Sequence, residues 1–403
     1  MISAAARPYI DASVPVLREH GLAITRRFYS NMFAAHPELT NLFNMGNQAS
    51  GVQQQSLAAA VFAYAANIDN VAALAPVITR IVHKHVSVGI VPAHYPIVGR
   101  HLLGAIQEVL GEAAVPPLLA AWDEAYTALA DALIAAERTM YAEAHITPGQ
   151  FRPMQVQAIV EECTDVTAYT LVAPDGAAVP AFKPGQYVSV RVSLPGGKTQ
   201  LRQYTLSDRP RADQLRITVK RAIARADAPE GQVSTLLLHD LAVGSMVDVS
   251  HPFGDFIPDT VGTAPIVLLS GGIGITPMIA ALNEIAETQP QRHVVFAHAA
   301  GGPAHHAHRA DVAAARLRMP NLQVMTFYQS DVDDQAGSPG REVRSGTMRF
   351  ADMPSWPHAT TNVYMCGPIP FMQAQWRDLI SAGVPAKHLH REVFGPELLD
   401  VLA

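Results

Sequence analysis

The chain has 403 residues, of which 49% are hydrophobic and 16% are charged, and its net charge is −6. This composition excludes a disordered chain and leaves room for roughly two to four domains with sizeable cores. The acidic balance, without any basic block, argues against nucleic acid or an anionic membrane as a partner. Only two cysteines occur. So few cysteines favour a reducing compartment. Residues 1–11 contain no apolar core for a signal peptide, and we therefore expect a cytoplasmic protein.

Residues 1–143 show helical periodicity and predict an all-α domain, with prolines at several helix ends. Polar residues lie on its apolar stripes. Leu57, Val61 and Tyr64 form a stripe that extends one turn back to Gln53, for example. The full set on such stripes is Tyr29, Gln53, His85, Tyr95 and Glu137.

Buried polar side chains cost free energy unless they are paired, and a buried carboxylate costs most. Five of them in one small domain indicate a common partner, and a haem iron ligated by His85 would supply it. The alternative is a helical bundle whose core polar groups are satisfied by one another.

After a linker at 144–152, residues 153–258 predict short strands in an antiparallel barrel, at 156–160, 187–192, 215–219 and 246–249. Two runs in this region suit a flavin. In Arg202-Gln203-Tyr204-Thr205, the guanidinium can pair with a pyrophosphate and the ring can lie on an isoalloxazine. Gly231-Gln232-Val233-Ser234 opens a predicted helix, whose free N–H groups can hold a phosphate. Taken alone, the first run could also be an ordinary strand with an exposed arginine.

Residues 259–403 predict an α/β domain with a parallel sheet, including strands at 266–269, 294–297 and 363–365. The uncharged segment 260–283 is long enough to span a bilayer. Its loop Gly272-Ile273-Gly274-Ile275-Thr276-Pro277 predicts instead a strand, a dinucleotide-binding turn and a helix. No acidic residue follows 294–297 to bind a ribose hydroxyl, so the choice between NADH and NADPH stays open.

Three histidines stand close together at His305, His306 and His308. Such tracts can bind metal, but the surrounding Gly, Pro and Ala residues favour a solvated loop. We therefore expect these side chains to be exposed. Cys163 receives no role.

The flavin run is preceded by Pro184-Gly185-Gln186-Tyr187 and followed, after the dinucleotide loop, by Cys366-Gly367-Pro368. This order is similar to that of ferredoxin-reductase-like proteins, and with the helical domain the whole chain resembles a bacterial flavohaemoglobin. The resemblance implies an all-α globin, then an antiparallel β-barrel FAD domain, then an α/β parallel-sheet NAD(P)-binding domain.

The resemblance also implies roles for individual residues. In the globin domain, His85 would be the proximal iron ligand, Tyr29 and Gln53 the distal pair, and Tyr95 and Glu137 the proximal hydrogen-bond pair. Haem-pocket and electron-transfer positions would be Phe43, Leu57, Lys84 and Glu392. The segment Glu392-Val393-Phe394-Gly395-Pro396 would approach the flavin, although the family often has cysteine where Val393 stands.

The family activity so implied is nitric oxide dioxygenase, in which NAD(P)H reduces FAD, FAD reduces haem b, and O2 and nitric oxide give nitrate. We expect a monomer. Two alternatives stay open. One is an NAD(P)H-dependent haem or flavin reductase or oxidase that acts on O2 or peroxides. The other is a haem-based gas sensor or a globin that holds lipid in its distal pocket.

Overall fold

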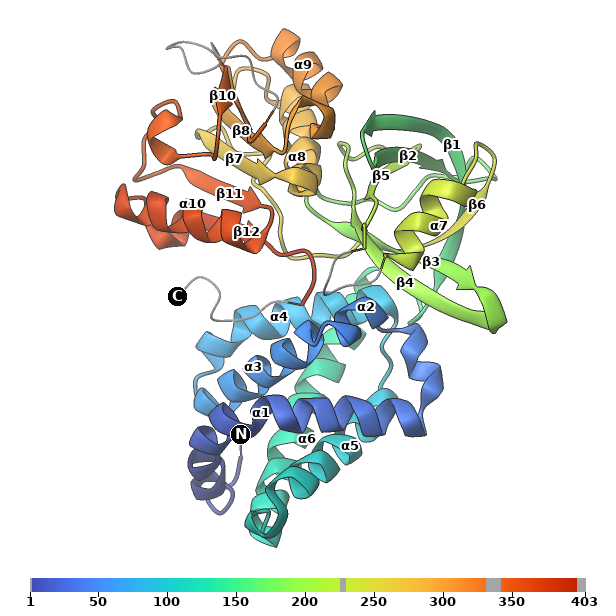
Figure 1. Ribbon diagram of the computed structural model, residues 1–403, viewed down its shortest axis with the longest axis vertical. Coiled ribbons are helices and arrows are strands. Elements are labelled where there is room, and N and C mark those ends of the chain that lie inside the picture. The colour runs from blue at the N-terminus through green and yellow to red at the C-terminus, as the bar shows by residue number, and fades with distance from the viewer. Residues whose placement is uncertain (1, 225–229, 331–341, 397–403) are drawn as a thin grey trace.

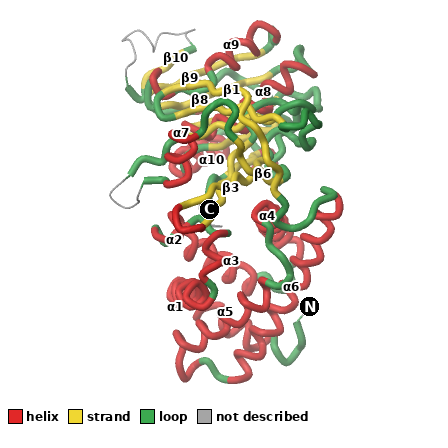
Figure 2. Tube along the Cα trace, turned by 90° about the vertical axis from the view of Figure 1, so that its right-hand side faces the viewer, coloured by secondary structure: helices red, strands yellow, loops and turns green. Residues whose placement is uncertain are grey.

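The computed structural model describes residues 2–224, 230–330 and 342–396, so residues 331–341 and 397–403 of the third expected domain lie outside the described part. Helices occupy the lower half of the molecule, with an antiparallel barrel and an α/β unit side by side above them (Figures 1 and 2). This arrangement confirms the expected fold class.

The lower unit consists of helices that pack their apolar stripes together around Ile10, Met32 and Ala105. The helices are α1 (Arg7–Ala35), α2 (Met45–Ala49), α3 (Val52–Ala66), α4 (Val71–Val88), α5 (His94–Leu110) and α6 (Pro116–Glu143). Helix α4 is capped at its start by Asn70, whose side chain accepts from the N–H of Ala73 at 3.1 Å. It ends at Gly89, which has φ 82°, a conformation that favours glycine.

The barrel is a sheet of six antiparallel strands in the order β4-β3-β6-β1-β2-β5. Its elements are β1 (Phe151–Cys163), β2 (Val166–Val172), β3 (Tyr187–Leu194), β4 (Lys198–Thr205), β5 (Leu215–Lys220), α7 (Gln232–Asp240) and β6 (Met246–Ser250). A bridge between Leu206 and Ile217 joins the two end strands and closes the barrel.

Of these strands, the sequence pattern did not predict β2, and it gave β4 only as the alternative interpretation of the Arg202–Thr205 run. Strand β2 follows β1 after a tight turn in which Asp165 has φ 62°, so no Gly or Pro marks the boundary. Strand β4 is rich in polar residues because part of it faces the helical unit, where Gln200 Nε2 donates to Thr40 O at 2.9 Å. Strand β1 also begins at Phe151, inside the expected linker.

The α/β unit contains a six-stranded parallel sheet in the order β10-β9-β8-β7-β11-β12. Its elements are β7 (Ile266–Gly271), α8 (Ile275–Thr288), β8 (Val294–Ala300), α9 (Arg309–Arg318), β9 (Leu322–Tyr328), β10 (Val343–Ser345), β11 (Asn362–Cys366), α10 (Ile369–Ser381) and β12 (Leu389–Glu392). Ile266 and Leu268 pack under α8, whereas Val267 and Leu269 pack on the face of α10. Helices thus cover both faces, as a parallel sheet requires.

The apolar segment 260–283 divides into β7, a turn and the start of α8, so the expected strand–turn–helix is confirmed. Among the described residues, no helix combines the length and apolar character needed to cross a bilayer.

Candidate functional site

Helices α1 and α3 bring Tyr29 and Gln53 together. The Gln53 Nε2 donates to the Tyr29 hydroxyl at 3.4 Å, and the ring of Phe43 stands edge-on to Tyr29 at 5.8 Å. Burial raises the pKa of Tyr29 to about 12, so its hydroxyl stays protonated at neutral pH. Leu57, one turn after Gln53, packs partly buried against the same cluster.

Three helices bring His85, Tyr95 and Glu137 together. Glu137 Oε1 lies 2.7 Å from His85 Nδ1 and accepts from the Tyr95 hydroxyl at 2.5 Å. The Glu137 side chain is buried, with 2% of its surface exposed. Burial and the neighbouring Glu137 carboxylate raise the pKa of Tyr95, which keeps the phenol a donor.

This arrangement fits a haem. A carboxylate on Nδ1 fixes the imidazole orientation and leaves Nε2 to bind a metal. Apolar side chains that are only partly buried surround the two polar sets, as a flat apolar cofactor would need. They include Phe43, Leu57, Val61 and Ile81. The five polar residues expected to share one partner thus form a distal pair and a proximal triad.

The flavin-run residues lie on β4 and at its end. The Arg202 guanidinium donates to Leu201 O at 2.7 Å and to Gln200 Oε1 at 3.1 Å, and Thr205 is buried. Burial raises the pKa of Tyr204 and of Tyr187, the neighbour on β3, so both phenols stay protonated.

The run Gly231-Gln232-Val233-Ser234 forms the start of α7, as the sequence predicted. A Cβ on Gly231 would lie 2.6 Å from the Cβ of Ala222, which explains the glycine. Val233 points into the barrel core, and the Ser234 hydroxyl accepts from the N–H of Ala222 at 3.1 Å. The first-turn N–H groups have no partner within the helix and are suited to a phosphate.

The two expected nicotinamide loops lie against each other, because β7 and β11 are neighbours in the sheet. A Cβ on Gly274 would stand 2.3 Å from Cys366 O, and one on Gly367 would stand 3.0 Å from the backbone nitrogen of Gly271. Cys366 is fully buried, and burial raises its thiol pKa, so it is not a thiolate at neutral pH. The remaining residues of the first loop link β7 to α8 and are Gly272, Ile273, Ile275, Thr276 and Pro277. In the second loop, Pro368 caps the start of α10.

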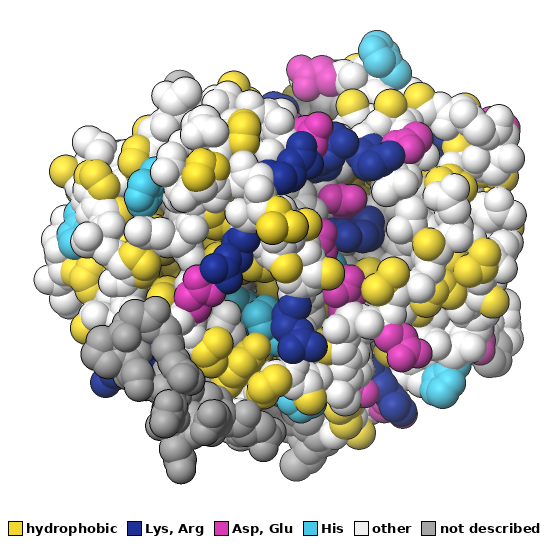
Figure 3. All heavy atoms as spheres, turned by 90° about the horizontal axis from the view of Figure 1, so that it is seen from above, with side chains coloured by type: hydrophobic (Ala, Val, Ile, Leu, Met, Phe, Trp, Pro, Cys, Tyr) yellow, Lys and Arg dark blue, Asp and Glu magenta, His cyan; other side chains and the backbone are white. Residues whose placement is uncertain are grey.

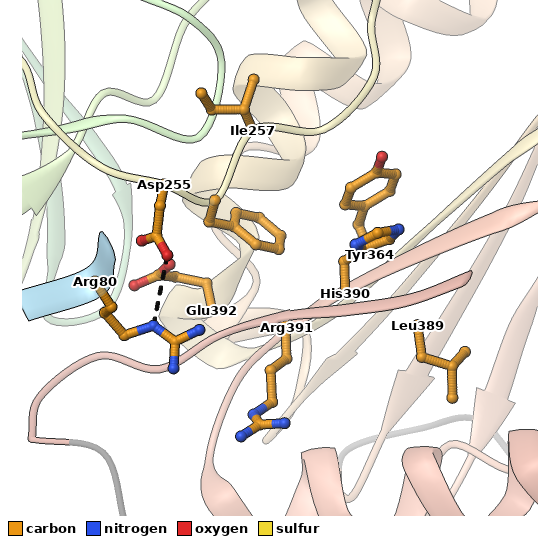
Figure 4. Close-up of a pocket in the computed structure, with 9 residues that line it drawn as sticks. Arg80, Asp255, Ile257, Tyr364, Leu389, His390, Arg391 and Glu392 are labelled. Atoms are coloured by element: carbon orange, nitrogen blue, oxygen red, sulfur yellow. Dashed lines mark ion pairs between the residues drawn. The ribbon is translucent and has the colours of Figure 1, made fainter. Parts of the chain in front are cut away.

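A pocket of about 270 Å³ lies where all three units meet (Figure 4). Arg80 comes from α4, Asp255 from the segment after the barrel, and Glu392 from the end of β12. Burial raises the pKa of Glu392 to about 7, and the charge of Lys84 opposes that shift. Burial also lowers the pKa of Lys84, whose Nζ donates to Gly395 O at 2.6 Å.

The segment after Glu392 presents its side chains in two directions. Val393 packs against the core of the α/β unit, whereas Phe394 is 47% exposed. An exposed aromatic side chain next to Gly395, the residue that Lys84 contacts, suits contact with a cofactor ring. Pro396 is the last described residue.

The expectation of a solvated loop at the histidine tract is wrong for two of its three residues. His306 and His308 are buried, and only His305 is exposed. His308 Nδ1 lies 2.9 Å from Asp311 Oδ2, and its Nε2 lies 3.0 Å from the Thr218 hydroxyl of β5.

Glu162 of β1 completes this cluster by accepting from the backbone N–H of His308 at 2.8 Å. Glu162, His308 and Asp311 are close enough to hold a metal ion. Arg216 and Asn283 already hydrogen-bond Asp311, and both ring nitrogens of His308 and both carboxylate oxygens of Asp311 have protein partners. The cluster is therefore an interdomain hydrogen-bond network, which the sequence could not reveal because its members come from distant segments.

Seen from above, basic and acidic side chains gather along a central band of the molecule (Figure 3). Ion pairs that join the barrel to the α/β unit include Arg216–Asp311 at 3.0 Å and Arg209–Glu287 at 4.0 Å. Charge pairing thus contributes to how the flavin and nicotinamide units meet.

Three family models match the chain in the order of the three units. They are Globin at residues 26–133, Oxidoreductase FAD-binding domain at 153–257, and Oxidoreductase NAD-binding domain at 268–376. A flavohemoprotein of Bordetella parapertussis is 45% identical over 402 residues, covering 98% of this chain and 99% of the relative. The chain belongs to the flavohemoprotein family. It is an oxidoreductase whose domains bind haem, FAD and NAD.

Other relatives agree. A flavohemoprotein of Halalkalibacterium halodurans is 40% identical and covers 98% of this chain and 97% of its own length. The flavohemoglobin of Malassezia yamatoensis, solved with bound FAD and heme, has a TM-score of 0.85 at 28% identity and covers 98% of this chain and 100% of its own. The FAD/NAD-binding domain of a nitric oxide dioxygenase from Vibrio cholerae has a TM-score of 0.55 at 32% identity, over 61% of this chain and 99% of its own.

Two residues at the domain junctions of this flavohemoprotein were not predicted from the sequence. His83 accepts from the N–H of Gly254 at 3.1 Å, and Ser87 accepts from Gln203 at 2.7 Å. On α4, His83 points away from His85, because two residues turn a helix by about 200°. No pattern identified the barrel as the surface that this face contacts.

Proposed function

We propose that this flavohemoprotein is a nitric oxide dioxygenase that uses NAD(P)H, O2 and nitric oxide and produces nitrate. The observation that carries the proposal is the distal pair, a Tyr29 phenol held in its protonated form beside the Gln53 amide. Two neutral donors in a buried pocket favour retention of a polar oxygen ligand over its release. The structural neighbour from Vibrio cholerae, named a nitric oxide dioxygenase, supports the same activity.

The proximal triad supports this role from the other side. When bound, haem supplies the iron at which O2 is activated. His85 would bind that iron through Nε2, because Nδ1 is engaged by Glu137. The Glu137 carboxylate, fixed by the Tyr95 hydroxyl, holds the Nδ1 proton and makes the imidazole a stronger electron donor.

The reductase part would hold the other two cofactors. Arg202, Tyr187, Tyr204 and the start of α7 would bind FAD, and the paired loops at Gly274 and Cys366 would bind the nicotinamide cofactor. Division of the chain at about residues 143, 152 and 258 belongs to this proposal and follows the element boundaries within a few residues.

The test is nitric oxide consumption by the haem- and FAD-loaded protein with NADH in air, with nitrate quantified. Rapid loss of nitric oxide with a matching yield of nitrate is the expected result. Steady NADH oxidation that nitric oxide does not accelerate, without nitrate, would overturn the proposal and assign the chain to a reductase or oxidase with another acceptor.

A further inference from the structure

Ser87 lies two residues after His85 on α4 and is buried, with 1% of its surface exposed. Its hydroxyl donates to Lys84 O at 2.8 Å and accepts from Gln203 Nε2 at 2.7 Å. One buried hydroxyl of the globin domain thus contacts a residue of the flavin run.

These contacts form a short bonded path between the units. Gln203 stands between Arg202 and Tyr204 in the flavin run, and its side chain reaches Ser87 across the domain boundary. The Ser87 hydroxyl in turn donates to Lys84 O, which is the carbonyl oxygen of the peptide bond between Lys84 and His85. Two hydrogen bonds therefore connect the strand of the flavin run to the peptide group of the residue that would bind iron.

The other globin–barrel contacts follow different routes. Asn41 Oδ1 accepts from the N–H of Thr199 at 3.1 Å, and Thr40 O accepts from Gln200. These two contacts join the start of β4 to the short helical turn before α2, whereas His83 on α4 accepts from Gly254, after the last barrel strand, and not from the flavin run. A serine that only satisfied its own helix would need the Lys84 carbonyl and no partner on the barrel.

We propose that Ser87 is the positioning residue that couples the flavin strand to the ligand helix during electron transfer from flavin to haem. The inference rests on the proposed function for one step alone, the passage of electrons from the flavin to the globin domain. In this transfer NADH is the reductant and two ferric irons are the oxidants. Each NADH yields two ferrous irons, NAD⁺ and one proton, which leaves the flavin site for solvent.

The experiment is rapid-mixing spectroscopy of the haem- and FAD-loaded Ser87→Ala protein with NADH, without oxygen and under carbon monoxide. Flavin reduction should match the wild type. Haem reduction should slow by roughly tenfold, the effect expected when a buried hydrogen bond is lost. The midpoint potentials of both cofactors and the iron–histidine vibration should not change. Ser87→Thr, which keeps the hydroxyl, should restore part of the rate.

Asn41→Ala is the matched control, because it removes a contact of the same interface that lies off the path. It should leave haem reduction close to the wild-type rate. Equal slowing by Asn41→Ala and Ser87→Ala would overturn the inference in favour of simple docking, and so would wild-type haem reduction in Ser87→Ala.

If Ser87→Ala does not fold, Gln203→Leu breaks the same hydrogen bond from the barrel side, with FAD content measured to exclude cofactor loss. It should slow haem reduction as Ser87→Ala would, and a wild-type rate with full FAD content would overturn the inference. None of these rates involves nitric oxide. A wild type that makes no nitrate, together with a slowed Ser87→Ala, would remove the dioxygenase proposal and keep this one.

Discussion

At the residue scale, the distal pair depends on one phenol. Tyr29→Phe removes the hydroxyl that meets Gln53 and keeps the ring that packs against Phe43. Oxygen dissociation should become roughly tenfold faster, since one hydrogen bond to a polar ligand is lost. Nitric oxide turnover should fall, while flavin reduction by NADH stays unchanged. Flash photolysis of the oxygen complex and stopped-flow measurement of the flavin separate the two effects.

Tyr64→Phe is the control for this substitution, because Tyr64 is also a tyrosine in the globin core and donates to Ala125 O at 2.9 Å. It should not alter oxygen dissociation. Loss of flavin reduction in Tyr29→Phe to the same extent as nitric oxide turnover would contradict the assigned role.

Glu392 makes stability depend on pH. Its pKa is about 7 in the folded protein and 4.5 in its ordinary state, so between these values the folded chain holds a proton that the unfolded chain releases. Stability should therefore fall as the pH rises from about 4.5 to about 7, by about 3 kcal/mol, from 1.36 kcal/mol per pKa unit. Glu392→Gln should remove this slope, as measured by thermal unfolding at pH 5 and pH 8.

A matching substitution at an exposed carboxyl of α6, Glu143→Gln, should leave the slope as in the wild type. If wild type and Glu392→Gln lose stability in parallel over this pH range, Glu392 is not the group responsible.

At the element scale, two loops from different strands share one close contact at Gly274. Gly274→Ala would put a Cβ 2.3 Å from Cys366 O. Because that oxygen belongs to the backbone of the second loop, the two loops must separate. We expect a rise in the KM for NADH of roughly tenfold, without loss of haem or FAD. Steady-state reduction of an artificial acceptor measures this.

Gly301→Ala provides the comparison in the same unit, since its Cβ would meet no atom closer than 3.5 Å. Its KM for NADH should stay near that of the wild type, and a similar rise in both variants would contradict the specific contact.

The sequence predicted helices better than strands. Stripes at helical spacing located α3 to α6 and indicated that His85, Tyr95 and Glu137 share an interior. Strand β4 was given only as an alternative for the flavin run, because contact with the globin domain, rather than a buried apolar face, sets its composition. A strand that serves an interface does not carry the alternation by which strands are recognised.

At the scale of the whole molecule, a network around His308 joins the barrel to the α/β unit. His308→Asn keeps a residue that tolerates the observed φ of 60° and removes the imidazole. Breaking this buried network should cost about 3 kcal/mol. Calorimetry should then show the NAD-binding unit unfolding at a lower temperature than the remainder, with His305→Asn at the exposed neighbour as the unaffected control.

A single unchanged transition in His308→Asn would show that the network does not hold the units together. The sequence suggested a solvated loop here because Glu162 and Thr218, the partners of His308, stand far away along the chain. The same limit applied to Ser87, whose partner Gln203 is 116 positions away. The local sequence pattern indicates only the composition of a segment, whereas tertiary packing decides which distant residues its side chains contact.

The bond between Lys84 and Gly395 spans 311 positions. During synthesis the N-terminal part of a chain emerges and folds first. The globin domain can therefore assemble long before Gly395 leaves the ribosome, and the junction around Glu392 can close only near the end of translation. A nascent chain interrupted before that point would carry a globin without its electron supply.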